Sequence, residues 1–592
     1  MSVVHHADLP AIQECLEASD LHRLFLHALH WGATRHPPQP IPAAHGLPTG
    51  LVATPVAELG GVLAFRLDWP EPGLPTLAER RTVSRVLAGR FAEHLLCVVA
   101  DGQQVLAFVW PRHRPDGQRE LRALIYERGT PARTTVEQLA RLRFGLDELA
   151  DGGPSLTEVL ERLDRAFDVQ AVSEHFYHDY AEAFHRAEQL TTGLPSEARR
   201  PFVQRLFDQL LFVRFVERKG WLRFDSRADY LRALWEDYQR HRSPDGSFYA
   251  ERLRLLFHAG LNTPHEVDVA GIRRDGFLAR RIGQVPFLNG GLFEEREEET
   301  LAQVPDDALA PLVDDLLYRY NLTVSESTPL DLEVAVDPEM LGQVFERLVT
   351  YRHETGAYYT PRPIVSFMCQ QALKTYLEAA CPGERPETLT SFIERREAAG
   401  LRDPEAVLDA LRRVTVCDPA CGSGAYLVGM LHELLGLRQA LFQARSLDPR
   451  SIYERKLEII ERSLYGVDLD PMAVEIARLR LWLSLIVDFE GEGPPPPLPN
   501  LDFKIAAGDS LTAPAPSAAQ LALRKALVDE FAAAKAAYLH AAEHGEKERL
   551  RQRIAELRQQ IATWSQAERD DGFDWAVEFA EVFAGSGFDI VV

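Results

Sequence analysis

The chain has 592 residues, of which 46% are hydrophobic and 26% charged. This composition is that of globular proteins and excludes wholesale disorder, and at roughly 100–200 residues per domain the length allows about three to five domains. The net charge of −23 argues against a nucleic-acid binder, because neutralising phosphates needs a basic surface. It does not exclude a local basic groove or a missing basic part.

The sequence carries no sign of membrane insertion or secretion. No apolar run approaches the roughly 18 residues that span a bilayer, and the first residues lack the apolar segment of a secretory signal. The six cysteines are too scattered for a disulfide framework. The sequence therefore predicts a cytoplasmic protein that does not enter a membrane.

Residues 1–135 predict a small α/β module. Strand-like runs occur at 62–67, 95–99, 105–110 and 123–126. The dipeptide Asp101-Gly102 predicts a hairpin turn between the second and third of these runs. Helical patterns at 11–30 and 79–91 complete the expected module.

Residues 136–335 predict a helical domain. An apolar helix covers 206–216, and Gly220 is placed to end it. Further helices are expected at 228–238 and 252–259. The segment 287–293 is a glycine turn between apolar residues.

Residues 336–592 predict an α/β domain with a helical hairpin inserted at about 521–568. Leu550, Ile554 and Leu557 follow each other at alternating spacings of four and three, which is a heptad seam. Each arm is short for a stable dimer, so the seam favours an antiparallel packing arm over a dimerising coiled coil.

The segment 414–427 has the strongest chemical signal. A β-branched run ends in Asp418-Pro419, a loop of small residues follows, and a helix is expected from Ala425. Glycine allows close approach of a ligand, and a helix N-terminus offers free N–H groups to an anion. An ordinary strand–turn–helix connection would explain a lone Gly-x-Gly, but the longer string 418–424 is far more specific.

That string resembles the S-adenosylmethionine motif of amino-methylating DNA methyltransferases, most closely the adenine-N6 branch. Three further segments agree with the family in the same order, at 354–361, 464–471 and 507–511. The resemblance implies that the cofactor contacts Tyr359, Thr360, Pro361, Asp418, Ala420, Gly422, Gly424, Asp468, Asp509 and Ser510.

The resemblance also implies separate roles for these residues. Thr360 and Pro361 would help hold the carboxylate of the cofactor, Asp468 would bind the ribose hydroxyls, and Asp509 would meet the adenine amino group. The chemistry agrees, because a carboxylate at a strand end accepts hydrogen bonds from a diol or an exocyclic amine. Asp470 competes with Asp468, but an N-cap role at the helix that starts with Pro471 explains it better.

A metal site is not expected. Cys417 and Cys421 are four residues apart and have no nearby histidine or second cysteine pair, so they make a poor zinc site. We expect both to be small buried residues beside the cofactor loop.

The upstream segments 212–222 and 287–293 resemble the helical region of large, multidomain methylases. Such proteins occur in type IIG restriction–modification systems and in phage-defence systems such as BREX and DISARM. The expected fold is an incomplete Rossmann-like S-adenosylmethionine-dependent methyltransferase core, preceded by a helical domain and a small N-terminal α/β domain.

The family's catalytic motif is missing from the sequence. Methylation needs the adenine flipped out of the duplex, and the family holds it with an Asn/Asp-Pro-Pro-Tyr/Phe tetrapeptide after the fourth strand. No such tetrapeptide occurs in the sequence, and 574–579 and 587–592 resemble the approach to that strand. We expect the tetrapeptide just after Val592, so none of the residues in this sequence is predicted to be catalytic.

The sequence therefore predicts a site-specific DNA adenine-N6 methyltransferase that is truncated and inactive by itself. Its partners would be double-stranded DNA, bound through a missing C-terminal domain, and subunits of a defence system. The alternatives are a non-catalytic cofactor-binding scaffold completed by a second polypeptide and a protein-amide methyltransferase, which the long helical region disfavours.

A nuclease at the N-terminus is not expected to be active. In the nuclease of type IIG proteins, an Asp is followed by a Glu-x-Lys on a strand, and these residues together hold a metal ion. Asp68 could be that Asp, but 105–110 contains neither Glu nor Lys, and the first lysine of the chain is Lys219. The module is then a degenerate nuclease or an unrelated fold.

Overall fold

The computed structural model describes residues 9–43, 47–113, 119–129, 132–150, 152–264, 276–289, 291–322, 331–333, 342, 360–491, 493–511, 525–562, 573–583 and 585–592. The chain forms two compact units. Unit 1 consists of Met1–Ala183 and Ala310–Asp337, and unit 2 of Phe184–Leu309 and Pro338–Val592. The division into three domains at residues 135 and 335 stays a prediction.

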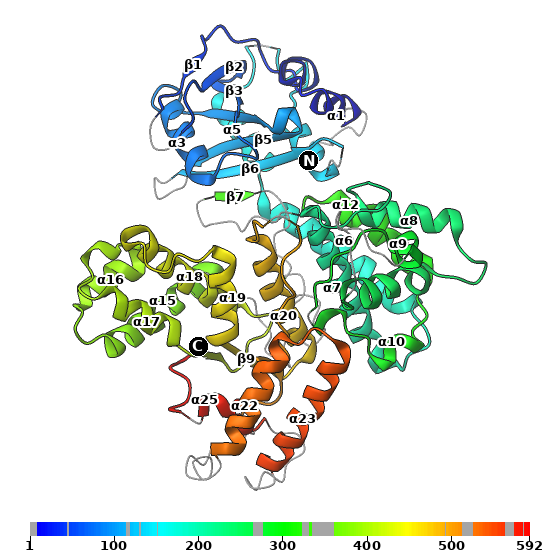
Figure 1. Ribbon diagram of the computed structural model, residues 1–592. Helices are drawn as coiled ribbons and strands as arrows, with labels where there is room; N and C mark the ends of the chain where they lie inside the picture. Colours follow the sequence, from blue (N-terminus) through cyan, green and yellow to red (C-terminus); the bar gives the residue numbers. More distant parts are fainter. Residues whose placement is uncertain are drawn as a thin grey trace. The chain divides into compact units, whose positions relative to one another are not determined.

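Unit 1 is built on a seven-stranded mixed sheet in the order β1-β2-β3-β4-β5-β6-β7 (Figure 1). Its strands are β1 (Gln39–Pro40), β2 (Val52–Leu59), β3 (Val62–Asp68), β4 (His94–Ala100), β5 (Val105–His113), β6 (Arg119–Glu127) and β7 (Asp331–Glu333). The pairs β3/β4 and β6/β7 are parallel and the others antiparallel. The four predicted strands and the hairpin are confirmed, whereas the sequence interpretation missed β1, β2 and β7.

Helices flank this sheet. They are α1 (Leu9–Glu17), α2 (Leu21–Arg23), η2 (Leu24–Ala28), α3 (Leu77–Ala88), η3 (Asp101–Gln103), α4 (Arg133–Ala140), α5 (Leu156–Ala166), α6 (Val169–Leu190, whose end belongs to unit 2), η7 (Pro311–Leu316) and α12 (Leu317–Arg319). The helical pattern predicted over 11–30 is confirmed, but it is divided into separate helices around residue 19. Ser19 has a φ of 53°, and the Asp20 side chain accepts from the N–H of Arg23 to start a new helix.

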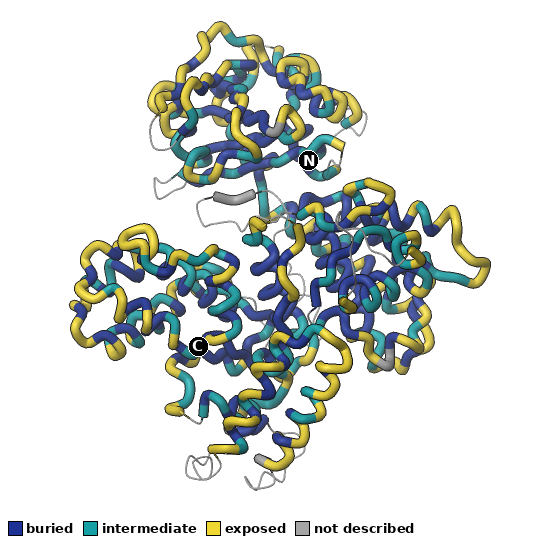
Figure 2. The backbone as a smooth tube through the Cα atoms, in the orientation of Figure 1, coloured by how far each residue is buried: buried dark blue, intermediate teal, exposed yellow. Residues whose placement is uncertain are grey.

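The first part of unit 2 is helical. It contains α7 (Ser196–Arg218), α8 (Tyr230–His241), η4 (Tyr249–Leu253), η5 (Leu255–Leu261), α9 (Gly276–Ile282), η6 (Gly291–Phe293), α10 (Glu297–Leu301) and α11 (Asp306–Ala310). Figure 2 shows that α7 is buried along most of its length, as expected of a helix that is apolar on several faces. Gly220, with a φ of 75°, follows its end as predicted.

The second part of unit 2 contains a four-stranded parallel sheet in the order β10-β9-β8-β11. The strands are β8 (Val416–Asp418), β9 (Leu464–Asp468), β10 (Ile505–Ala507) and β11 (Ile590–Val591). Around it lie α15 (Arg362–Ala380), α16 (Pro386–Arg395), η8 (Ala398–Gly400), α17 (Pro404–Arg413), α18 (Ala425–Arg445), α19 (Ile452–Arg462) and α20 (Pro471–Val487). In chain order the strands are arranged 3-2-1-4, the order of a doubly wound sheet.

The last helices are α22 (Lys525–His540), α23 (His544–Ala562), α24 (Trp575–Glu578) and α25 (Ala580–Phe583). Ile554 and Leu557 of α23 pack with Phe531 and Tyr538 of α22 in one apolar cluster. The heptad seam therefore faces the neighbouring helix of the same chain. No helix in the described part of the chain is long and apolar enough to cross a membrane.

The helical part of unit 2 is joined to the sheet part by the glycine turn at 287–293. The side-chain amide of Asn289 donates to the carbonyls of Leu498, at 3.0 Å, and Ala541, at 3.1 Å. The main chain of Leu498 donates to Leu288 at 2.6 Å, and α7 packs against α20. This turn therefore fastens two regions that lie about two hundred residues apart in sequence.

Candidate functional site

Three predicted acids meet at the carboxyl edge of the parallel sheet. Asp418 is the last residue of β8, Asp468 is the last residue of β9, and Asp509 lies two residues beyond β10. Because β8, β9 and β10 are adjacent and parallel, their carboxyl ends lie side by side. Ligands of open α/β sheets bind outside this edge.

The loop between β8 and α18 folds over the end of β9. The N–H of Cys421 donates to the Val467 carbonyl at 2.9 Å, and the N–H of Gly422 donates to Oδ2 of Asp468 at 2.8 Å. The loop thus holds the predicted ribose-binding acid in place. The helix starts at Ala425 as predicted, with Gly424 as its N-cap.

The two glycines of this loop have different surroundings. Both have positive φ, 51° at Gly422 and 82° at Gly424. A Cβ at Gly424 would lie 3.0 Å from Cβ of Ala477 in α20, whereas a Cβ at Gly422 would meet nothing within 4 Å. Gly424 therefore serves helix packing, and Gly422 leaves open space that a ligand can enter.

Asp470 has the N-cap role that its position predicted, whereas the ribose-binding role of Asp468 stays a prediction. Oδ1 of Asp470 accepts from the N–H of Met472 at 2.8 Å, which confirms it as the N-cap of α20. Asp468 accepts from Gly422 through Oδ2 and from the N–H of Asp470, at 2.9 Å, through Oδ1. Each carboxylate oxygen keeps further lone-pair capacity, so hydroxyl groups of a ligand can still bind there.

Asp418 is the most buried of the three acids. Only 3% of the residue is exposed. Oδ1 accepts from the N–H of Ala420 at 3.2 Å, while Oδ2 has no hydrogen-bond partner among the described residues. Burial, with a smaller contribution from the charge of Asp468, raises the pKa of Asp418 to about 7.

The remaining predicted residues lie around the same edge. The Ser510 hydroxyl donates to the Pro419 carbonyl, and Oδ1 of Asp509 accepts from the N–H of Leu511 at 2.9 Å. Thr360 precedes Pro361, the N-cap of α15, and that helix packs on α18. Tyr359 lies outside the described residues.

Three residues at this edge escaped the sequence interpretation. Leu469 is 70% exposed and Leu511 is 94% exposed, and each follows a strand-end acid by one or two positions. This short spacing could have identified both leucines in the sequence, because an exposed apolar side chain beside an acid can pack against a flat ring that the acid binds. Arg480 of α20 donates to the carbonyl of Ser423, at 2.8 Å, and to its hydroxyl, at 3.1 Å. No local pattern in the sequence predicts that contact.

The two cysteines beside the loop are both buried and free. Burial raises the pKa of Cys417 and of Cys421, so both thiols are neutral at pH 7. Among the described residues, no group of three or more His, Cys, Asp or Glu side chains is placed to hold a metal ion.

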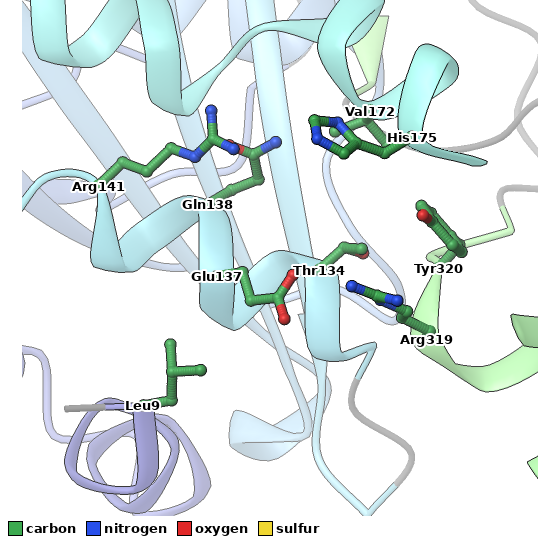
Figure 3. Close-up of a pocket in the computed structure, with 9 residues that line it drawn as sticks. All are labelled: Leu9, Thr134, Glu137, Gln138, Arg141, Val172, His175, Arg319 and Tyr320. Carbon is green, nitrogen blue, oxygen red and sulfur yellow. The ribbon is translucent and has the colours of Figure 1, made fainter. Parts of the chain in front are cut away.

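Unit 1 contains a separate cavity of about 250 Å³ (Figure 3). It is lined by Leu9, Thr134, Glu137, Gln138, Arg141, Val172, His175, Arg319 and Tyr320. Arg319 is paired with Asp179 at 3.0 Å, and the Tyr320 hydroxyl donates to the same carboxylate at 2.8 Å. The cavity contains none of the predicted site residues.

Asp68, the candidate nuclease acid, is exposed and forms an ion pair with Arg66 at 2.7 Å. It lies at the end of β3, next to the parallel strand β4. The next strand, β5, offers no Glu or Lys side chain. Asp68 thus lacks the Glu-x-Lys partners on β5 that the nuclease motif requires.

Two family models match the sheet part of unit 2. Residues 395–489 match the DNA-methyltransferase domain of MmeI, and residues 462–592 match the Eco57I restriction-modification methylase. A putative type II restriction enzyme and methyltransferase of Methanocaldococcus jannaschii is 32% identical over an alignment of 334 residues that covers 53% of this chain. The match spans 27% of that relative's length.

Solved structures give weaker similarities. The type IIL restriction-modification enzyme MmeI in complex with DNA is 20% identical, with a TM-score of 0.36, over 58% of this chain and 40% of that one. A DrdV–DNA complex is 12% identical, with a TM-score of 0.26, over 93% of this chain and 42% of that one. At such low TM-scores these two similarities carry no functional weight. Residues 395–592 are nevertheless similar throughout to methyltransferase domains of restriction–modification enzymes.

Proposed function

We propose that unit 2 carries the S-adenosylmethionine-binding part of a site-specific DNA adenine-N6 methyltransferase of a restriction–modification system. The observation that carries the proposal is the convergence of Asp418, Asp468 and Asp509 with the glycine loop at one sheet edge. That edge lies inside the residues that match methyltransferase models. The 3-2-1-4 strand order supports a Rossmann-like core. The three-domain layout and a role in a phage-defence system stay predictions.

The residues at this edge fit the proposed cofactor. The free Oδ2 of Asp418 suits a cationic group, and the open space at Gly422 lets the ligand approach the main chain. Asp468 is held where it can accept from ribose hydroxyls. Leu469 and Leu511 supply apolar surface for the adenine ring, with Asp509 as acceptor for its amino group.

In the proposed reaction the cofactor supplies an electrophilic methyl group on its sulfonium. The chain's own residues bind and orient that cofactor, and Arg480 fixes the loop through Ser423. Orientation is important because the rate depends steeply on the alignment of the reacting atoms. The group that would hold a flipped adenine, an Asn/Asp-Pro-Pro-Tyr/Phe tetrapeptide, is absent from the 592 residues.

Calorimetric titration with S-adenosylmethionine tests the cofactor site. We expect Gly422→Val to abolish binding, because the new side chain fills the open space, and Asp468→Asn to weaken it about tenfold or more, since hydrogen bonds to charged groups contribute about 1.5–3 kcal/mol. Gly73→Val is the matched control, because Gly73 in unit 1 has a φ of 78° and equally open space. Undiminished binding by both site variants would refute the placement.

Transfer of tritiated methyl groups to duplex DNA tests the reaction. We expect no transfer by the 592-residue chain, and labelling of adenine N6 when a segment with the missing tetrapeptide and a DNA-recognition domain are supplied. Robust adenine labelling by this chain alone would contradict the proposed dependence on that tetrapeptide. Cytosine labelling by the completed form would move the protein to the other amino-methylating branch.

A further inference from the structure

The carboxyl group of Asp418 is buried but only half satisfied. One oxygen accepts the N–H of Ala420, and the other has no hydrogen-bond partner in the described part of the chain. A buried ionised carboxylate is strongly unfavourable unless it is paired and fully hydrogen-bonded. The ligand-free site therefore favours the neutral, protonated carboxyl group.

The groups around Asp418 do not supply a compensating charge. Asp468 at the end of β9 is an acid and disfavours ionisation of its neighbour. Three buried thiols surround the site from β8, the loop and α15, namely Cys417, Cys421 and Cys369. Each has a pKa that burial raises and that the charge of Asp418 raises further, so all three are neutral.

Charged side chains on the neighbouring helices are engaged elsewhere. Arg480 of α20 donates to Ser423. Glu433 of α18 accepts from the Ser366 hydroxyl at 2.6 Å and is paired with Arg396. Among the described residues, no cation contributes to the pKa of Asp418. The charge that would stabilise its ionised form must come from a ligand.

We propose that Asp418 carries a proton in the ligand-free protein and releases it to solvent when the ammonium group of S-adenosylmethionine binds beside it. The inference rests on the proposed function, because it takes this cofactor as the ligand. The ammonium group is preferred over the sulfonium because Asp418 lies on the side covered by α15, where it interacts with Cys369. Thr360 and Pro361 at the start of that helix are the predicted partners of the adjoining carboxylate.

The consequence is a cofactor affinity that rises with pH. With a pKa of about 7, binding at pH 6 should release about 0.9 proton, and binding at pH 7 about 0.5. The affinity should rise about fivefold between these pH values, since only the ionised carboxylate pairs with the ammonium group, which keeps its own proton in this range.

Isothermal titration calorimetry of the full chain in two buffers of different ionisation enthalpy counts the released protons. We expect release with S-adenosylmethionine and with S-adenosylhomocysteine, which keeps the ammonium group, and none with 5′-methylthioadenosine, which lacks it. Asp418→Asn should abolish both the release and the pH dependence, while Asp470→Asn, a matched change at the N-cap of α20, should keep them because Asn caps a helix as well as Asp does. Circular dichroism checks that each variant is folded.

The outcomes separate this inference from the proposed function. If wild-type protein binds S-adenosylmethionine without releasing a proton, the inference is wrong and the cofactor site stands. Release with S-adenosylmethionine alone would assign the effect to the sulfonium and overturn the ammonium assignment. Unchanged release by folded Asp418→Asn would assign the proton to another group. If the wild-type chain binds none of the three compounds, the proposed function fails and the inference fails with it.

Discussion

Each unit contains a strand–loop–helix connection that leads to a parallel neighbouring strand, yet only one of the two builds a candidate site. In unit 1, Asp68 ends β3, but its carboxylate is exposed and already paired with Arg66. In unit 2, the main-chain N–H of Gly422 in the loop holds Asp468, and Asp418 keeps a free oxygen. An acid at a strand end is therefore not a site by itself, because it must also be free of side-chain cations and covered by a loop that a ligand can approach.

Buried and exposed ion pairs also differ, and breaking a buried one should have the largest effect. Arg478 of unit 2 is buried and pairs with Glu475 at 3.1 Å and Asp502 at 3.0 Å. Replacing it in Arg478→Met removes the ion pair of Asp502, while Glu475 keeps its pair with Arg296, so we expect a loss of about 3–5 kcal/mol in unfolding free energy. Denaturation in urea, followed by tryptophan fluorescence, measures this loss.

The matched change in unit 1 is Arg133→Met, which removes an exposed pair with Glu137 at 2.8 Å. We expect a loss of only about 0.3–0.5 kcal/mol, the usual contribution of such helix pairs. Equal losses in the two variants would show that burial does not determine what these two ion pairs contribute to stability.

The glycines of the two loops should also respond differently. In Gly424→Val the new Cβ would lie 3.0 Å from Ala477 at a φ of 82°. We expect a loss of about 3 kcal/mol, combining left-handed strain of about 1–2 and overpacking of about 1–3 kcal/mol. Gly73→Val, at a φ of 78° with open space, should lose only the strain. Similar midpoints of urea denaturation would show that contact with α20 is unimportant.

Two buried groups should contribute to the stability of the fold with opposite pH dependence. His94 of unit 1 is fully buried, and burial lowers its pKa to about 4. Its unfolded form binds more protons between about pH 4 and 6.5, so its contribution to stability rises with pH, by about 3 kcal/mol in all. Asp418 has a raised pKa of about 7, its folded form binds more protons, and its contribution falls by a similar amount between about pH 4 and 7.

Differences between wild type and variants in urea denaturation isolate these contributions. His94→Gln should flatten the rise below pH 6.5, and Asp418→Asn should remove the decline towards pH 7. If Asp418→Asn left the pH profile unchanged, the carboxyl group would have to be ionised in the folded protein.

The smallest expected effect is in DNA cleavage. Asp68 lacks the Glu-x-Lys partners of the nuclease motif on β5, so the purified chain with magnesium should leave plasmid DNA intact. Asp68→Ala should behave identically in the same gel assay. Metal-dependent nicking that disappears in this variant would show that unit 1 holds an active nuclease site.

Local patterns in the sequence were enough to predict the main parts of the candidate site. Short buried strands that end in Asp418 and Asp468, and the glycine string between the first strand and its helix, are local patterns. Their placement at one edge follows from the geometry of parallel strands, whose carboxyl ends lie on the same side. The N-cap role of Asp470 was visible for the same reason, because a cap and its helix are adjacent in sequence.

The distant residues that support that site are visible only in the folded protein. The contact of Arg480 with Ser423 and the anchoring of Asn289 to Leu498 join positions far apart in the chain. Oδ2 of Asp418 lacks a hydrogen-bond partner among the described residues because residues from several elements bury it. Such features leave no periodic or local pattern in a sequence, because they depend on how separate helices and strands pack, and packing alone fixes which polar groups find partners.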